Sequence, residues 1–150
     1  MPRTRTIHAL AAGLLSASFL AGPAVAEGLK LGALIPLTGG LATYGESSLN
    51  GMRLAVEQAN AADGVLDGEV ELVVGDTQTR SQPAVDAANR LVGVEGVSGI
   101  LGALSSGNTV PVATSVSAVE GIPQISNAST APTITTLDDN DFLFRTVPSD

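Results

Sequence analysis

The sequence predicts an α/β fold in which a parallel sheet lies between two layers of helices. Two observations support this class. Short apolar segments of strand length alternate with amphipathic segments of about ten to fifteen residues, and small polar turns follow the apolar segments. Strands joined in this way use right-handed crossovers, which place helices on both faces of the sheet. The 150 residues suffice for one ordinary domain.

The first 26 residues have the layout of a secretory signal peptide. Two arginines form a basic start, Ala9–Leu20 is apolar, and Ala24-Val25-Ala26 offers a cleavage site of small residues. The alternative, a membrane anchor, fits less well because the apolar run is shorter than the roughly 20 residues that span a bilayer. We therefore expect a signal peptide at 1–26, and export of residues 27–150 to the periplasm with no further insertion into the membrane.

The chain that remains after cleavage is strongly acidic. It keeps five lysines and arginines against fifteen aspartates and glutamates, and it contains neither histidine nor cysteine. Without a basic patch it is a poor candidate for binding nucleic acid or an anionic membrane surface. Without cysteine, neither a lipid-modified N-terminus nor a disulfide framework is available.

The first strand is predicted at Leu29–Ile35, an apolar run that ends at Pro36 and a pair of glycines. From Leu49 to Ala59 apolar residues recur at helical spacing, and Ser47 or Ser48 is placed to cap this helix. Asp63-Gly64 is a common stop signal, so the helix should end there.

The second strand is predicted at Glu69–Gly75, followed by a polar loop. Ser81 opens a second helix, since Pro83 falls in its first turn, where the missing N–H costs nothing. Gly93–Gly96 ends the helix, and Val97–Leu104 forms the third strand.

A turn of small polar residues, Ser105–Thr109, follows the third strand, and a third helix is expected at Thr109–Val119 with Pro111 near its first turn. A short fourth strand at Gly121–Ser126 precedes a second polar loop. After an acidic turn, Phe142–Thr146 forms the last strand.

The two polar turns are the candidate ligand site. Each follows a strand, and the first precedes a helix, whose free N–H groups and positive dipole end favour an anion. The hydroxyls of Ser106 and Thr130 can donate to a carboxylate or accept from an ammonium group. Two alternatives remain open: Ser105, Ser106 and Asn108 simply cap the third helix, or Ser129 and Thr130 only form a turn before a proline.

Other chemistries find less support. Ala103–Gly107 differs at one position from the G-x-S-x-G elbow of serine hydrolases, and Ser105 as its nucleophile would need a histidine base that the exported chain lacks. No phosphate-binding glycine motif is present. The acidic run Asp138–Asp141 lacks the spacing of a calcium loop, so we expect no metal ion and no cofactor.

Five stretches, taken in chain order, resemble a known family. They read L-G-A-L-I-P-L-T-G-G-L-A-T-Y-G, N-G-M-R-L-A-V-E-Q-A-N, V-V-G-D-T-Q-T-R-S-Q-P-A-V-D-A-A-N-R-L-V, G-A-L-S-S-G-N-T-V-P-V-A and I-P-Q-I-S-N-A-S-T-A-P. Together they are similar to the N-terminal lobe of periplasmic leucine/isoleucine/valine-binding proteins. These are the solute receptors of branched-chain amino-acid ABC transporters.

The resemblance implies a two-lobed fold that closes on an amino acid like a hinge and is read by a permease in the inner membrane. Carried over by position, the implied ligand contacts are Tyr44, Ser105, Ser106, Ala128, Ser129 and Thr130. Ser106 and Thr130 match the main hydroxyl contacts, and Tyr44 matches an aromatic residue that lines the side-chain pocket. The alternative for Tyr44 is a loop aromatic that covers the core.

The chain departs from the family because relatives continue into a second lobe, whereas this sequence stops at Asp150. We therefore expect 27–150 to be the N-terminal lobe of a truncated solute-binding protein. Which amino acid or small polar solute it takes stays open, and so does a role as a ligand-sensing module without transport.

Overall fold

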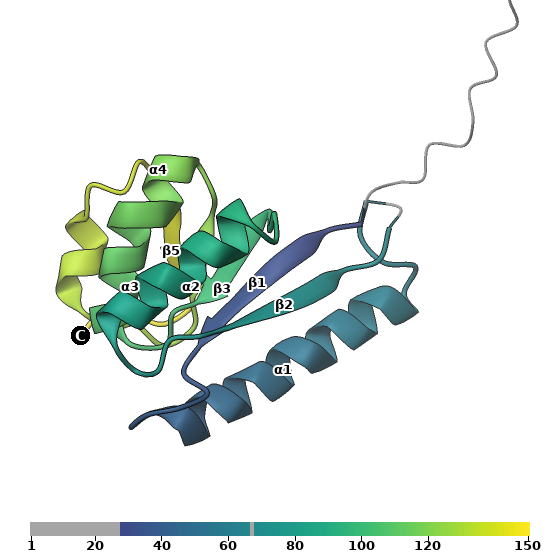
Figure 1. Ribbon diagram of the computed structural model, residues 1–150, viewed down its shortest axis with the longest axis horizontal. Helices are drawn as coiled ribbons and strands as arrows, with labels where there is room; N and C mark the ends of the chain where they lie inside the picture. The colour runs from purple at the N-terminus through teal and green to yellow at the C-terminus, as the bar shows by residue number, and fades with distance from the viewer. Residues whose placement is uncertain (1–27, 67) are drawn as a thin grey trace, which may run out of the picture.

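A single five-stranded sheet forms the centre of the molecule. The structure, a computed structural model, describes residues 28–66 and 68–150. All strand pairs are parallel, and helices lie on both sides of the sheet (Figure 1). The α/β architecture predicted from the sequence is therefore confirmed. The predicted signal peptide at 1–26 lies outside the described residues.

The elements follow the predicted order. The strands are β1 (Lys30–Ile35), β2 (Glu71–Asp76), β3 (Gly99–Gly102), β4 (Gln124–Ser126) and β5 (Leu143–Arg145). The helices are α1 (Ala42–Ala61), α2 (Ser81–Gly93), α3 (Ser106–Val112), the π-helical turn η1 (Ala113–Ser117), α4 (Ala118–Glu120) and the 3-10 helix η2 (Pro132–Thr136). The segments α3, η1 and α4 follow one another without a break. Of these elements, η2 was not predicted.

The strand order, β2-β1-β3-β4-β5, reverses direction at β1. The chain first moves outward from β1 to β2 and then crosses back over β1 to β3. Because both crossovers are right-handed, α1 lies on one face of the sheet and α2 and α3 lie on the other (Figure 1). In open α/β sheets such a reversal leaves a crevice at the carboxyl ends of the strands. Here the reversal falls between β1 and β3.

The two faces of the sheet carry cores of unequal size. The larger core lies under α2 and α3 and comprises Leu34, Ala84, Ala88, Leu91, Val97, Ile100, Ala103, Val112 and Val116. The smaller core lies under α1, where only Ala33, Ile35 and Leu49 are fully enclosed. Most of the buried apolar surface, and hence most of the hydrophobic stabilisation, is therefore on the α2–α3 side.

The predicted start of α1 was wrong. The helix begins at Ala42, and neither Ser47 nor Ser48 caps it. The N–H of Leu41 instead donates to Thr79 Oγ1 over 3.1 Å, so the terminus is capped by the loop after β2. Helical periodicity is a local pattern, so it could not predict this bond to Thr79, which lies 38 residues further along the chain.

The third helix also starts earlier than predicted, at Ser106, so that Pro111 lies inside it rather than in its first turn. A proline has no N–H to donate to the carbonyl four residues back, which here belongs to Gly107. Ser81 Oγ on α2 donates to that oxygen over 2.9 Å. The hydroxyl of a neighbouring helix thus replaces the backbone hydrogen bond that Pro111 removes.

A substitution at Gly102, at the end of β3, tests how closely the backbones of β1 and β3 approach each other. Its φ is +135°, and a Cβ added there would lie 2.0 Å from the carbonyl oxygen of Leu34. We expect Gly102→Ala to lower the free energy of unfolding by about 3 kcal/mol or more, measured by urea denaturation. Gly93→Ala is the matched control because nothing lies within 4 Å of its added Cβ. Equal effects of the two substitutions would contradict the close approach.

Candidate ligand-binding site

The two polar turns predicted to hold a ligand lie side by side at the carboxyl edge of the sheet. β3 and β4 are parallel neighbours, with Ile100 beside Gln124 and Leu101 beside Ile125. Their turns, 103–105 and 127–131, therefore leave the sheet at the same edge. The N–H of Ala131 donates to Ser106 Oγ over 3.2 Å, which links the second turn directly to the start of α3. The predicted juxtaposition is confirmed.

Three fully buried hydroxyl groups join the turns from beneath. Thr109 Oγ1 donates to the carbonyl of Ala103 at 2.9 Å and lies 2.8 Å from Ser129 Oγ. Ser126 Oγ lies 2.7 Å from both that carbonyl and Ser129 Oγ. All three side chains are 0% exposed. We call this set, Thr109, Ser126 and Ser129, the hydroxyl cluster. Each hydroxyl can both donate and accept a hydrogen bond. The cluster therefore supplies hydrogen-bond partners for backbone carbonyls that the short strands leave unpaired.

The first turn presents Ser105 and Ser106 at the start of α3. Ser105 has extended backbone angles, and its carbonyl accepts the N–H groups of Asn108 and Thr109, both at 2.9 Å. No side chain caps this helix. The structure therefore does not support the alternative in which these serines serve only as helix caps. Both serines are half-buried, and Ser106 borders a shallow depression of about 360 Å³.

The three predicted ligand contacts of the second turn, Ala128, Ser129 and Thr130, differ in burial and in their hydrogen-bond partners. Ser129 is 0% exposed, and its hydroxyl is bonded within the hydroxyl cluster. Thr130 is half-buried, and its Oγ1 donates to Asp150 Oδ2 at 2.7 Å. Ala128 is exposed and offers only a small apolar side chain.

Tyr44 lies in the first turn of α1 rather than in a loop as predicted. Its side chain is 66% exposed, so it does not cover the core. Ser48, one turn further on the same flank of the helix, accepts a hydrogen bond from Asn127 Nδ2 at 3.0 Å. This bond joins α1 to the residue before Ala128 and so directs the flank of Tyr44 toward the second turn.

The loops after β1 and β2 are held together by Asp76, a residue that the sequence reasoning treated only as part of a loop. Its Oδ1 accepts the N–H groups of Leu37 and Gln78, both at 2.8 Å, and its Oδ2 accepts the hydroxyl of Thr38 at 2.7 Å. Burial alone would raise the pKa of this carboxyl. The hydrogen bonds outweigh burial and hold the pKa below its ordinary value of 3.8.

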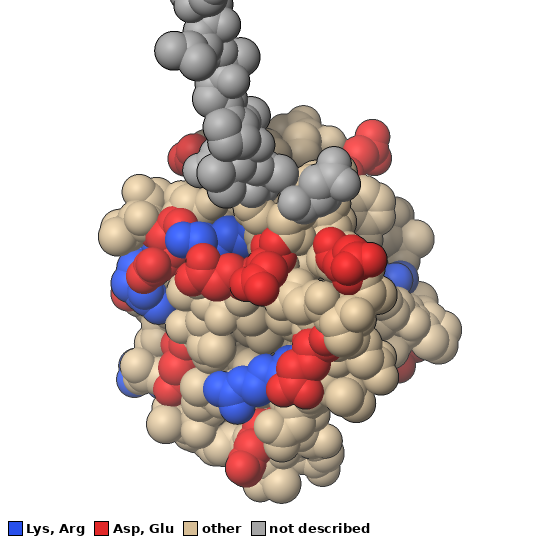
Figure 2. All heavy atoms as spheres, turned by 90° about the vertical axis from the view of Figure 1, so that its right-hand side faces the viewer, with Lys and Arg blue, Asp and Glu red and all other residues tan. Residues whose placement is uncertain are grey.

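Acidic and basic side chains are interspersed on the face of the molecule at the opposite edge of the sheet, where the strands begin (Figure 2). Lys30 and Glu71, at the starts of β1 and β2, form an ion pair at 3.4 Å. Tyr44, Ser105, Ser106, Ala128 and Thr130 are themselves uncharged, and the charged groups bonded to the second turn are Asp150, which accepts the hydroxyl of Thr130, and Arg145, whose Nη1 donates to the carbonyl of Ala131 at 3.1 Å. Within residues 28–66 and 68–150, no three His, Cys, Asp or Glu side chains gather as metal ligands would.

Comparison with known proteins decides the family. The family described as periplasmic binding protein matches residues 28–150. The chain belongs to the periplasmic binding protein family. In the part that the structure describes, no helix is both long enough and apolar enough to span a bilayer. Members of this family are binding proteins rather than enzymes, and they work outside the cytoplasm.

Individual relatives show which members of the periplasmic binding protein family this chain resembles. The chain is 39% identical over 88 residues to "Leu/Ile/Val-binding protein homolog 7" of Brucella abortus, covering 59% of this chain and 22% of that protein. It superposes with a TM-score of 0.77 and 29% identity on LivJ of Streptococcus pneumoniae in complex with isoleucine, covering 82% of this chain and 34% of LivJ.

A leucine-binding protein, LivK of Thermotoga maritima, gives a TM-score of 0.73 at 30% identity, covering 81% of this chain and 33% of LivK. The chain thus spans about a fifth of that curated relative and about a third of these two structures. The similarity to leucine/isoleucine/valine-binding proteins inferred from the sequence is confirmed.

Thr109→Val tests the hydroxyl cluster. The substitution keeps the shape of the side chain but leaves the carbonyl of Ala103 and the hydroxyl of Ser129 with one partner fewer in a dry site. We expect the free energy of unfolding to fall by about 1–3 kcal/mol. Thr114→Val, on an exposed part of η1, should change it by less than about 0.5 kcal/mol. A Thr109 variant as stable as the control would show that the cluster does not support the turns.

Asp76 predicts a pH dependence of stability. Because the folded pKa lies below the ordinary 3.8, the ionised form is favoured in the folded state. Its contribution is present above 3.8 and is lost as the pH falls through the folded pKa. Asp76→Asn should cost about 1–2 kcal/mol at neutral pH and flatten the loss of stability in acid, measured by thermal unfolding across pH. Asp138→Asn controls for the removal of one negative charge, and an unchanged acid profile in Asp76→Asn would contradict the assignment.

Proposed function

We propose that this chain is the first lobe of an extracytoplasmic solute-binding protein and that its carboxyl edge holds the charged head group of an amino acid. One observation supports this above all others. The turns of Ser106 and Thr130 lie at the ends of neighbouring strands and are joined by the hydrogen bond from Ala131 N–H to Ser106 Oγ. They lie beside the point where the strand order reverses, which is where open α/β sheets bind ligands.

The donors of this edge suit a carboxylate. Ser106 Oγ accepts the N–H of Ala131, so its own proton is free to be donated. The start of the helical segment 106–120 adds N–H groups and a positive dipole end. Thr130 Oγ1 already donates to a carboxylate, that of Asp150. A ligand carboxylate that binds Thr130 takes the place of this internal one.

The remaining contacts suit an aliphatic side chain. Tyr44 and Ala128 are exposed, uncharged and directed to the same end of the sheet by the bond between Ser48 and Asn127. A small apolar wall of this kind favours the side chain of a branched-chain amino acid. Solved structures similar to this chain include one in complex with isoleucine and one described as leucine-binding.

In the full protein a second lobe closes over the ligand, and the closed form is the one that an ABC permease in the inner membrane recognises. The first 26 residues direct export to the periplasm and are then removed. In this proposal 27–150 is the N-terminal lobe, and the chain covers about a third of its structural neighbours. A serine hydrolase is not favoured because the exported chain has no histidine to serve as a base for Ser105.

One lobe alone should bind weakly. Each hydrogen bond to a charged group contributes about 1.5–3 kcal/mol, so the loss of two or three contacts from the other lobe weakens binding by about a thousandfold or more. Titration of the chain with leucine, followed by NMR, should shift the amides of 105–107 and 128–131 and saturate only at millimolar concentration. Ser106→Ala should weaken this binding about tenfold.

Two controls make the titration specific. Leucinamide lacks the carboxylate and should give much smaller shifts at the same amides, while Ser115→Ala, an exposed serine on η1, should bind leucine as the unchanged chain does. Saturable shifts that map elsewhere, or equal responses to leucine and leucinamide, would contradict the proposed site. Micromolar binding would show that the second lobe is unnecessary.

A further inference from the structure

The two hydroxyl groups at the carboxyl edge have opposite internal partners. Ser106 Oγ accepts the N–H of Ala131 over 3.2 Å, whereas Thr130 Oγ1 donates its proton to Asp150 Oδ2 over 2.7 Å. A hydroxyl group has one proton to donate and two lone pairs that accept. Ser106 therefore keeps its proton for a ligand, while Thr130 has used its proton and keeps lone pairs. The first hydroxyl can donate to a carboxylate, and the second can accept from an ammonium group.

Asp150 is bonded to Thr130 at two points. Its N–H donates to the carbonyl of Thr130 over 3.0 Å, and its side chain accepts the hydroxyl of the same residue. Neither bond involves the α-carboxyl group of Asp150. Hydrogen bonds to an ionised carboxylate are shorter and stronger than those between neutral groups. The pair of bonds therefore sets the direction of the Thr130 proton before a ligand arrives.

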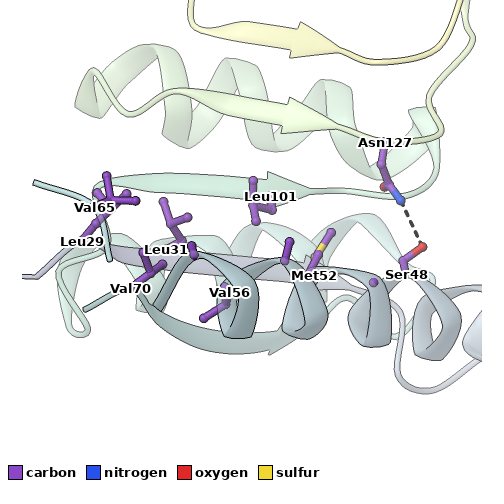
Figure 3. A pocket seen from close by; sticks show the side chains of 12 residues that line it. Leu29, Leu31, Ser48, Met52, Val56, Val65, Val70, Leu101 and Asn127 are labelled. Atoms are coloured by element: carbon purple, nitrogen blue, oxygen red, sulfur yellow. Dashed lines mark hydrogen bonds between the residues drawn. The ribbon is translucent and has the colours of Figure 1, made fainter. Parts of the chain in front are cut away.

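The second turn, which carries Thr130, is held at both ends. At its start, Asn127 Nδ2 donates to Ser48 Oγ on α1 over 3.0 Å, at one end of the apolar groove that lies between α1 and the sheet (Figure 3). At its end, Arg145 Nη1 on β5 donates to the carbonyl of Ala131 over 3.1 Å. A backbone held in this way keeps the hydroxyl of Thr130 within reach of Asp150.

The carboxylate of Asp150 also places a negative charge beside Thr130. Within residues 28–66 and 68–150, no lysine or arginine forms an ion pair with Asp150. Its charge attracts a ligand ammonium group and repels a ligand carboxylate, although solvent and salt screen both effects because Asp150 is exposed. A ligand carboxylate binds Thr130 only by displacing Asp150, whereas an ammonium group can bind Thr130 with Asp150 in place.

We propose that Asp150 is a positioning residue that makes the carboxyl edge selective for ligands with both an ammonium and a carboxylate group. By holding the proton of Thr130, Asp150 turns this hydroxyl into an acceptor for the ammonium group, while Ser106 donates to the carboxylate. Because Ala131 directly follows Thr130 and is bonded to Ser106, the two hydroxyls are neighbours and serve one small head group. The inference rests on the proposed function and names the ligand class of that site, which is free α-amino acids rather than monocarboxylates of the same shape.

A comparison of leucine with 4-methylpentanoate tests this selectivity, because the second compound has the carbon skeleton and carboxylate of leucine but no ammonium group. Both are titrated at constant ionic strength, and binding is followed by NMR at the amides of 105–107 and 128–131. The unchanged chain should bind leucine about tenfold or more tightly than 4-methylpentanoate. Asp150→Ala frees the proton of Thr130 and removes the charge, so this preference should fall to about threefold or less.

Asp138→Ala is the matched control, because Asp138 is exposed and its loss changes the net charge by the same amount. This variant should keep the leucine preference of the unchanged chain. Circular dichroism verifies that each variant is folded. A preference that Asp150→Ala retains, or that both variants lose equally, would overturn the inference.

A double substitution tests whether Asp150 acts through Thr130. Thr130→Val removes the hydroxyl and keeps the shape of the side chain. In the Thr130→Val background, Asp150→Ala should alter the leucine preference by about twofold or less, because only the screened charge is lost. An effect as large as in the unchanged chain would overturn the positioning role. If leucine shifts the amides of neither turn, the proposed function fails and the inference with it, whereas leucine binding with an unaltered preference in Asp150→Ala overturns the inference alone.

Discussion

The buried hydroxyl cluster is the interaction on which the carboxyl edge of this protein depends. β3 has four residues and β4 has three, so their ladder of backbone hydrogen bonds is too short to orient the turns that follow. Thr109, Ser126 and Ser129 provide the missing constraint in a site from which water is excluded. In such a site, satisfied polar groups are rigid and unsatisfied ones are costly. The positions of Ser106 and Thr130 follow from this cluster.

The other loops at this edge are held in the same manner, by side chains bonded to the backbone of a neighbour. Asp76 joins the loops after β1 and β2, and Ser81 joins α2 to the start of α3. Each bond is modest by itself. Together they order the edge before any ligand arrives, which reduces the entropy lost on binding.

The two faces of the sheet differ in how completely they are buried. The α2–α3 face encloses a core of nine buried residues, while the α1 face encloses three and leaves Ile125 and Phe144 exposed. The turns of Ser106 and Thr130 lie at the carboxyl edge of the sheet rather than on either of its faces.

Local patterns in the sequence by themselves determined the fold class and the neighbourhood of the two turns. Alternation of apolar runs and helical periodicity predicted the strands and helices, because each pattern repeats over a few residues. The carboxyl ends of parallel strands share an edge, and this placed Ser106 near Thr130. Tertiary structure decided the strand order, the early start of α1, the burial of Ser129 and the roles of Asp76 and Ser81. These features depend on partners that are remote in the chain, which no local pattern contains.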